Sequence, residues 1–164
     1  MAKPKGYSRP QIVLHWAVAV LVMFQFILQG SIAEAWDGLQ AGDVPYISAA
    51  VISHVAGGML ILTLVIWRLV LRRKRGAPGA PADTPALMRW AAMAGHWGLY
   101  GLLIVLPVTG MLAWFAGIDA AAAVHSVLRL VLFGVIVLHL LGSMLHAALG
   151  LGVMGRMFQA TDAR

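Results

Sequence analysis

The sequence predicts an all-α integral membrane protein built as a four-helix bundle. Of its 164 residues, 61% are hydrophobic and only 11% are charged, whereas an average soluble domain has about 25% charged residues. Four apolar stretches are long enough to cross a hydrocarbon core of about 30 Å as helices of about 20 residues. We expect a single membrane domain, residues 1–164, with spans at residues 12–30, 47–71, 90–117 and 124–152.

The first expected span, residues 12–30, follows a basic lead that contains Lys3, Lys5 and Arg9. A basic lead before an apolar run also occurs in secretory signal peptides, which end in a small-residue cleavage site. This run lacks such a site and carries His15 near its start. We therefore interpret it as a retained membrane span.

The second expected span, residues 47–71, ends in a basic cluster that continues into a glycine- and proline-rich connection, residues 72–89. That composition predicts an exposed loop. The basic residues near this loop and near the two chain ends include Lys3, Lys5, Arg9, Arg68, Arg72, Arg73, Lys74, Arg75, Arg156 and Arg164. Because basic residues mark the cytoplasmic side of a membrane protein, we predict that the loop and both the N and C termini are cytoplasmic.

The two opposite connections are acidic and contain neither Lys nor Arg. Their carboxylates are Glu34, Asp37 and Asp43 in the first and Asp119 in the second. The basic residues thus follow the membrane boundary, and topology accounts for the net charge of +6. We expect membrane lipid as the surroundings and no nucleic-acid partner.

The third expected span, residues 90–117, contains Pro107 and Gly110 within the sequence LPVTGM. Proline inside a helix removes one backbone donor and usually bends the helix. A neighbouring helix or a bound group must accommodate that bend.

The histidines are the main polar residues of the apolar stretches, while cysteine is absent. Without cysteine there are no disulfides, thiolate metal sites or iron–sulfur clusters, so redox chemistry would require a bound cofactor. Ionisable groups in membrane spans are costly and usually face the bundle interior. A hydrogen bond between helices is the alternative role for any single histidine, and it explains six of them poorly.

Two histidines of the fourth expected span, His125 and His139, are fourteen residues apart. On a helix this spacing is a rise of roughly 21 Å with an offset of about 40°, so both lie on one face at opposite membrane depths. His15 matches His139 in depth at the cytoplasmic side, and His54 matches His125 at the outer side. The geometry therefore predicts one bis-histidine pair in each leaflet.

Paired imidazoles favour haem over zinc. Imidazole is a good axial ligand for haem iron, and a six-coordinate iron with two protein ligands suits electron transfer. Zinc takes three or four ligands clustered at one depth, usually with carboxylate or thiolate among them. The expected spans contain no Asp or Glu.

Two further histidines leave the ligands of the cytoplasmic-side haem open. His146 follows His139 by seven residues and falls within about 20° of it on the helix. It is a candidate for contact with a haem propionate, for quinone binding, for a structural role or for replacing a proposed ligand of this haem. His96, with Tyr100 one turn further on the same face, is a candidate for contact with a haem edge or a quinone, or for replacing His15 or His139 as a ligand.

Three arginines are candidates for neutralising haem propionates, which are anions that arginine binds with two hydrogen bonds. Arg9 and Arg68 belong to the cytoplasmic side, where interfacial anchoring is their alternative role. Arg129 lies one turn after His125 inside the apolar run, where an unpaired guanidinium is costly. We expect it to face the propionates of the outer haem or the outer surface.

Several motifs occur in one order along the spans: YSRPQIVLHW at residues 7–16, ISHVAGGML around His54, WRLVLR at the end of the second span, GHWGLYGLLIVLPVTGM at residues 95–111, and VH at residues 124–125 with His139 fourteen residues later. Through them the chain resembles the bacterial cytochrome b561 family, which is related to the cytochrome b subunits of membrane hydrogenases and formate dehydrogenases. The resemblance covers nearly the full length.

The resemblance implies a multi-pass protein of the bacterial inner membrane that carries two haem b molecules and exchanges electrons with the quinone pool. It also implies His15, His54, His125 and His139 as the axial ligands. The expected function is electron transfer between an outer-face donor and quinone. One family member looks like a superoxide:ubiquinone oxidoreductase, but here Arg129 is the only cation near the outer connections that could attract an anion.

Two other functions remain open at this point. The chain could be a haem-bearing membrane anchor subunit that relays electrons for a partner dehydrogenase or hydrogenase, although the short outer connections offer little docking surface. A metal-ion transporter with a histidine path is the third, and the absence of carboxylates from the spans argues against it.

Overall fold

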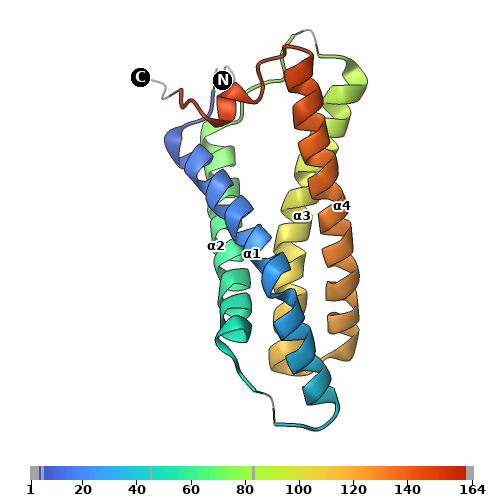
Figure 1. Ribbon diagram of the computed structural model, residues 1–164. Helices are drawn as coiled ribbons and strands as arrows, with labels where there is room; N and C mark the ends of the chain where they lie inside the picture. The colour runs from blue at the N-terminus through green and yellow to red at the C-terminus, as the bar shows by residue number, and fades with distance from the viewer. Residues whose placement is uncertain (1–3, 5, 45, 83, 162–164) are drawn as a thin grey trace.

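A computed structural model of the protein describes residues 4, 6–44, 46–82 and 84–161. It contains four long helices and a short 3-10 helix (Figure 1): α1, Arg9–Gln40; α2, Ala49–Arg75; α3, Ala86–Ala116; α4, Asp119–Ala148; and the 3-10 helix Gly155–Met157. Each of the four is long and apolar enough to cross a membrane. The described residues contain no strand, so the chain is an all-α four-helix membrane bundle, as predicted.

Local signals set the helix ends. At the start of α1 the backbone N–H of Ser8 donates to Gln11 Oε1 at 3.0 Å, and at the start of α2 the Ser48 hydroxyl accepts from the backbone N–H of Val51 at 3.3 Å. Gly76 and Gly117 follow α2 and α3 with φ values of 79° and 64°. Glycine adopts this left-handed conformation without strain, which ends both helices.

Two helices continue well past the expected spans at one end of the bundle. α1 runs on to Gln40, and α4 begins at Asp119. The extension of α1 keeps apolar residues at helical spacing, at Ile32, Ala35, Trp36 and Leu39. The side chain of Gln40 donates to Asp119 Oδ1 at 2.7 Å and joins the two extensions.

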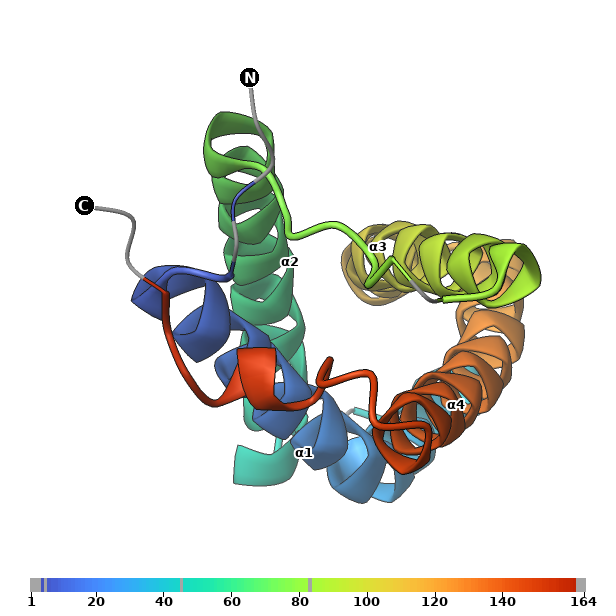
Figure 2. The ribbon, with the colours of Figure 1, turned by 90° about the horizontal axis from the view of Figure 1, so that it is seen from above.

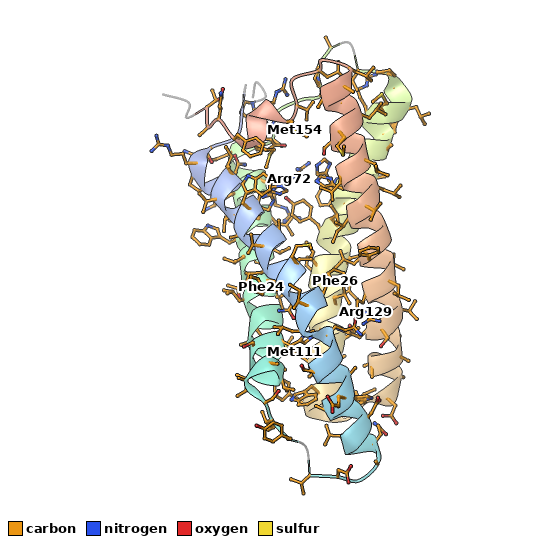
Figure 3. All side chains as sticks on the ribbon, in the orientation of Figure 1. Phe24, Phe26, Arg72, Met111, Arg129 and Met154 are labelled. Atoms are coloured by element: carbon orange, nitrogen blue, oxygen red, sulfur yellow. The ribbon has the colours of Figure 1, made fainter. Side chains whose placement is uncertain are left out.

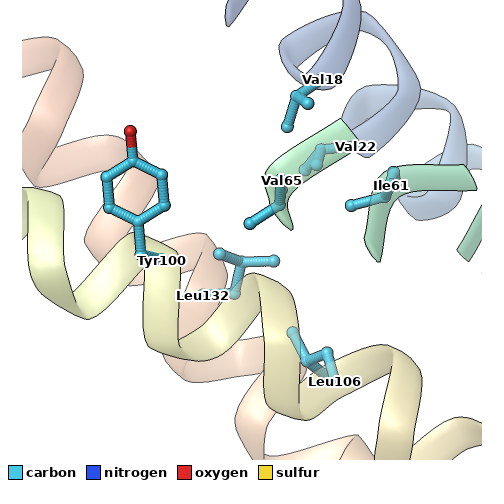
Figure 4. Packing of buried hydrophobic residues seen from close by; sticks show 7 residues of the cluster. All are labelled: Val18, Val22, Ile61, Val65, Tyr100, Leu106 and Leu132. Atoms are coloured by element: carbon cyan, nitrogen blue, oxygen red, sulfur yellow. The ribbon is translucent and has the colours of Figure 1, made fainter. Parts of the chain in front are cut away.

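The extensive helix contacts join α1 with α2, α2 with α3, and α3 with α4. Figure 2, a view along the bundle, shows the resulting pairs and the approach of α1 to α4. In the middle of the bundle the rings of Phe26 and Phe133 bring α1 and α4 into contact, with centroids 5.8 Å apart. All four helices contribute to one core cluster (Figure 4), made up of Val18, Val22, Ile61, Val65, Tyr100, Leu106 and Leu132.

Both described ends of the chain lie at the same end of the bundle. The backbone N–H of Thr161 donates to the Tyr7 carbonyl at 2.9 Å, and Gln11 Nε2 donates to the carbonyl of Gly76 in the α2–α3 connection at 3.0 Å. We call this end, with residues 76–82, 84 and 85, the chain-end side, and the end with residues 41–44, 46–48 and 117–118 the hairpin side.

Apart from Arg129, the described charged residues separate by sign between these two ends. The basic run at Arg72, Arg73, Lys74 and Arg75 closes α2 at the chain-end side, whereas Glu34, Asp37, Asp43 and Asp119 belong to the hairpin side. The basic chain-end side is the one predicted to be cytoplasmic, and this orientation stays a prediction. Lys3, Lys5 and Arg164, which also entered that prediction, lie outside the described residues.

Candidate functional site

Three helices bring histidines together near the chain-end side. The ring centroids of His15 on α1 and His139 on α4 are 6.4 Å apart. The ring of His96 on α3 lies 5.3 Å from that of His139. All three side chains are half-buried. The structure thus places His96 beside the two imidazoles that the sequence paired by depth.

Backbone hydrogen bonds orient two of the histidines near this end. His96 Nδ1 is within hydrogen-bond distance of the Ala92 carbonyl, and His146 Nδ1 lies 2.7 Å from the Gly142 carbonyl. Because a carbonyl oxygen only accepts, Nδ1 must carry the proton in both rings, and Nε2 keeps a free lone pair. Among the described residues, no ring contact joins His146 to the other imidazoles.

Arg68 of α2 makes hydrogen bonds to α3 and α1 beside the three imidazoles. Arg68 Nε donates to the Tyr100 hydroxyl at 3.0 Å, and Arg68 Nη1 donates to the Gln11 carbonyl at 3.1 Å. Tyr100 is 8% exposed. The Arg68 guanidinium is close enough to interact electrostatically with His15, His96 and His139.

A second arginine, Arg72, lies one turn further along α2 and stacks on aromatic rings of α3. Its Cζ is 5.6 Å from the centroid of the Trp97 ring and 5.8 Å from that of Tyr100. These are cation–π distances. Figure 3 shows Arg72 and Arg129 at different heights in the bundle. Arg72 is close enough to interact electrostatically with His96, and Arg129 with His125.

The second group of histidines lies toward the hairpin side. His54 on α2 and His125 on α4 both line a cavity of about 240 Å³, together with Arg129. All four helices contribute to its wall, which is mainly apolar and also includes Gln29, Trp36, Gly58, Pro107 and Gly110. The structure thus brings together three residues that the sequence analysis expected on the outer side.

His125 is held by the LPVTGM segment of α3. Its Nδ1 lies 2.9 Å from the Leu106 carbonyl and 3.2 Å from the Thr109 hydroxyl. The carbonyl bond again assigns the proton to Nδ1 and leaves Nε2 free. A Cβ on Gly110 would lie 3.1 Å from His125 Cε1, so the missing side chain allows the ring to approach α3.

The His54 ring has a nitrogen that makes no hydrogen bond to the described residues. Its Nδ1 is buried and has no hydrogen-bond partner among the described residues. A buried polar atom without a partner is costly. A bound group that reached this atom would satisfy it.

The geometry of the chain-end group fits a haem iron held between two imidazoles. A metal–nitrogen distance of about 2.0 Å on each side, with the half-widths of the two rings, puts the ring centroids about 6 Å apart. The His15–His139 separation of 6.4 Å agrees with this value. The His96–His139 separation of 5.3 Å is shorter, which favours His15 over His96 as the partner of His139.

The described residues contain no group of three or more His, Cys, Asp or Glu side chains that could hold a metal ion. Zinc sites need such a group. The zinc and metal-ion transport interpretations therefore find no support in the described part of the chain.

Four residues of these sites were not singled out by sequence reasoning: Gln11, Arg72, Leu106 and Thr109. Gln11 carried a detectable signal, because Ser8 and Gln11 have the S-x-x-Q spacing of a capping box. The others depend on how α3 packs against α2 and α4. Arg9, a predicted propionate contact, is exposed at the start of α1.

Comparison with known proteins gives consistent results. A family model described as prokaryotic cytochrome b561 matches residues 6–160. A protein named cytochrome b562 from Cereibacter sphaeroides is 31% identical over 146 residues, which cover 89% of this chain and 90% of the relative. A protein named probable superoxide oxidase CybB from Yersinia pestis is 28% identical over 166 aligned positions, which cover 87% of this chain and 89% of the relative.

Proposed function

Because the chain belongs to the prokaryotic cytochrome b561 family, we propose that its two histidine groups hold two haem b molecules and that it carries electrons between an outer-face donor and the quinone pool. Family and fold already establish a multi-pass protein of the bacterial inner membrane with the electron-transfer role of a membrane cytochrome b. The number of haems, the ligands and the quinone are the proposal.

The observation that carries the proposal is that the imidazoles form two separate groups. One group includes His139 and the other includes His125, which lie on opposite parts of α4. His15 and His139 would hold one haem and His54 and His125 the other. A bound haem supplies a reversible one-electron iron couple. The residues around it hold the imidazoles in place, exclude water and set the local charge.

The hydrogen bond from His125 Nδ1 to the Leu106 carbonyl leaves the Nε2 lone pair of this ring free to bind a metal ion. Arg68 and Arg129 each bring a cation to one group of histidines, where a guanidinium can bind a carboxylate of the cofactor. Arg68 keeps Nη2 available, because its Nε and Nη1 are already bound to Tyr100 and Gln11. His96, Tyr100 and His146 then remain for contact with a haem edge or a quinone.

Superoxide is one candidate donor, since a relative is named a probable superoxide oxidase. In this chain Arg129 lines the hairpin-side cavity, whereas the exposed charges at that end are the carboxylates Glu34, Asp37, Asp43 and Asp119. The surface therefore repels an anion at long range while the cavity attracts it at short range. The second candidate function is a membrane anchor subunit for a partner dehydrogenase or hydrogenase.

Purified protein reduced under anaerobic conditions tests the proposal directly. We expect a b-type absorbance spectrum, about two haems per chain, and reoxidation by an added quinone. Superoxide and ubiquinol, added separately, identify the donor and the direction of transfer. A protein without haem would contradict the proposed function, and co-purification with a catalytic subunit would favour the anchor.

A further inference from the structure

The segment after α4 crosses the chain-end side of the bundle and reaches α1. We call residues 149–161 the strap. Gly150 and Gly152 have φ values of 69° and 63°, and these left-handed conformations turn the chain away from the axis of α4. Figure 2 shows the strap passing over this end from α4 to α1.

The strap is bound at three places to other parts of the chain. The Arg156 guanidinium donates through Nη1 to the Gly79 carbonyl at 2.9 Å. Trp16 Nε1 on α1 donates to the Met157 carbonyl at 3.0 Å, and the Phe158 ring packs on the Trp16 ring at 5.3 Å. The backbone N–H of Thr161 donates to the Tyr7 carbonyl at 2.9 Å.

Trp16, which the strap contacts, also packs against the candidate haem ligand His15. Trp16 follows His15 directly, and the two rings meet edge to face with centroids 5.3 Å apart. A shift of the indole therefore moves or tilts the imidazole. The strap is thus joined to His15 through a single side chain.

The strap also joins α4 to α1 at the chain-end side. Besides the His15–His139 pair, a ring contact between α1 and α4 is made by Phe26 and Phe133, and Phe26 is eleven residues from His15, about 16 Å along the helix. The extensive contacts of α1 are with α2. Docking of the strap on Trp16 therefore adds a second restraint, beside helix packing, on the 6.4 Å separation of His15 and His139.

We propose that the strap sets the separation and tilt of His15 relative to His139, with Trp16 as the positioning residue, and thereby tunes the reduction potential of the chain-end haem. The inference rests on the proposed haem sites. Axial-ligand geometry and exclusion of water are among the factors by which a protein sets a haem potential. Trp16 is 42% exposed, and the strap covers part of its surface.

The test compares Trp16→Phe, which keeps a ring and removes the N–H donor, with Trp90→Phe as the matched control. Trp90 is 66% exposed on α3 near the same end. Arg156→Gln is a second variant that leaves Trp16 intact and removes the bond to Gly79. Because the chain has no native cysteine, a Gln159→Cys substitution takes a single nitroxide label that reports mobility of the strap.

We expect the label to become more mobile in Trp16→Phe and Arg156→Gln. The reduction equilibrium of the chain-end haem should change about tenfold in Trp16→Phe, which is about 59 mV for a one-electron couple. The potential of the hairpin-side haem should stay constant and show that each variant is folded. Trp90→Phe should change neither the label nor either potential.

Two results would overturn the inference. One is a mobile label with an unchanged chain-end potential, which would show that strap docking does not position His15. The other is a label that stays immobile in Trp16→Phe. Loss of the proposed function would be seen separately, as wild-type protein that binds no haem before any variant is compared.

Discussion

His125 Nδ1 and the Leu106 carbonyl oxygen are 2.9 Å apart across the α3–α4 interface. This hydrogen bond fixes the imidazole tautomer and ties a candidate ligand to the backbone of the neighbouring helix. It depends on close approach of the two helices at Gly110, where a Cβ would lie 3.1 Å from the imidazole Cε1. The contact therefore links the packing of α3 and α4 to the chemistry of the hairpin-side site.

Gly110→Ala should weaken the hairpin-side haem site. The added methyl group pushes the His125 ring from the Leu106 carbonyl, and overpacking of this kind costs about 1–3 kcal/mol. We expect partial loss of one haem, measured by haem content per chain, with the other retained. Gly134→Ala on α4 is the control, because a Cβ there meets nothing within 4 Å. Equal haem content in both variants would contradict the predicted role of Gly110.

Removal of one histidine from each proposed pair should remove one haem at a time. We expect His125→Ala or His54→Ala to lower the content from about two haems to one, and His15→Ala or His139→Ala to remove the other, because a six-coordinate iron requires both axial ligands. Redox titration followed by absorbance would show which component is lost. If all four variants lost the same component, the two-site arrangement would be wrong.

His96→Gln should keep both haems, even though the His96 and His139 rings are 5.3 Å apart. The separation of His15 from His139 fits a metal between the rings better, and the Nδ1 of His96 is bound to the Ala92 carbonyl. Haem content and quinone reduction are the measurements. Retention of both haems with slower reduction of quinone would support a role in quinone contact, whereas loss of a haem would make His96 the ligand.

Arg68→Gln should lower the midpoint potential of the chain-end haem. The guanidinium favours the reduced iron, which carries one positive charge less than the oxidised iron, so its removal stabilises the oxidised state. We expect the equilibrium of the hairpin-side haem to change far less. Arg75→Gln is the matched control, since Arg75 is exposed at the end of α2. An unchanged or raised chain-end potential would exclude this electrostatic role.

With superoxide as the donor, quinone reduction should become faster as salt is added. The exposed carboxylates of the hairpin side, among them Glu34 and Asp119, repel an anion, and salt screens this repulsion over a Debye length of about 10 Å at 0.1 M. Arg129→Gln should slow the reaction at every salt concentration. Stopped-flow measurement over a salt series is the check. A rate that falls with salt would indicate attraction and contradict this account.

The bundle was predictable because the thickness of a membrane fixes the length of an apolar helix, and the sequence has four runs of that length. The extension of α1 to Gln40 was not predicted, since residues 31–40 mix charged and apolar side chains. There only the helical spacing of apolar residues such as Ile32 and Trp36 indicates a helix. Hydropathy detects the membrane core and does not detect such an amphipathic end.

The sites were predictable to the extent that they follow from one helix. The spacing of His125 and His139 on α4 places them at different depths without knowledge of their neighbours. The position of His96 beside His139 and the bond of His125 to Leu106 require the angles and distances between helices. A single sequence contains no such information. The ligand assignment itself stays a prediction until the variants are measured.

The hydrogen bond between Trp16 and Met157 joins residues 141 positions apart in the sequence. The strap is synthesised after all four helices. The contact with α1 can therefore form only when nearly the whole chain has been made. Closure of so long a loop is slow relative to local helix formation. We therefore expect the hairpins to pair first and the end that holds His15 to close last.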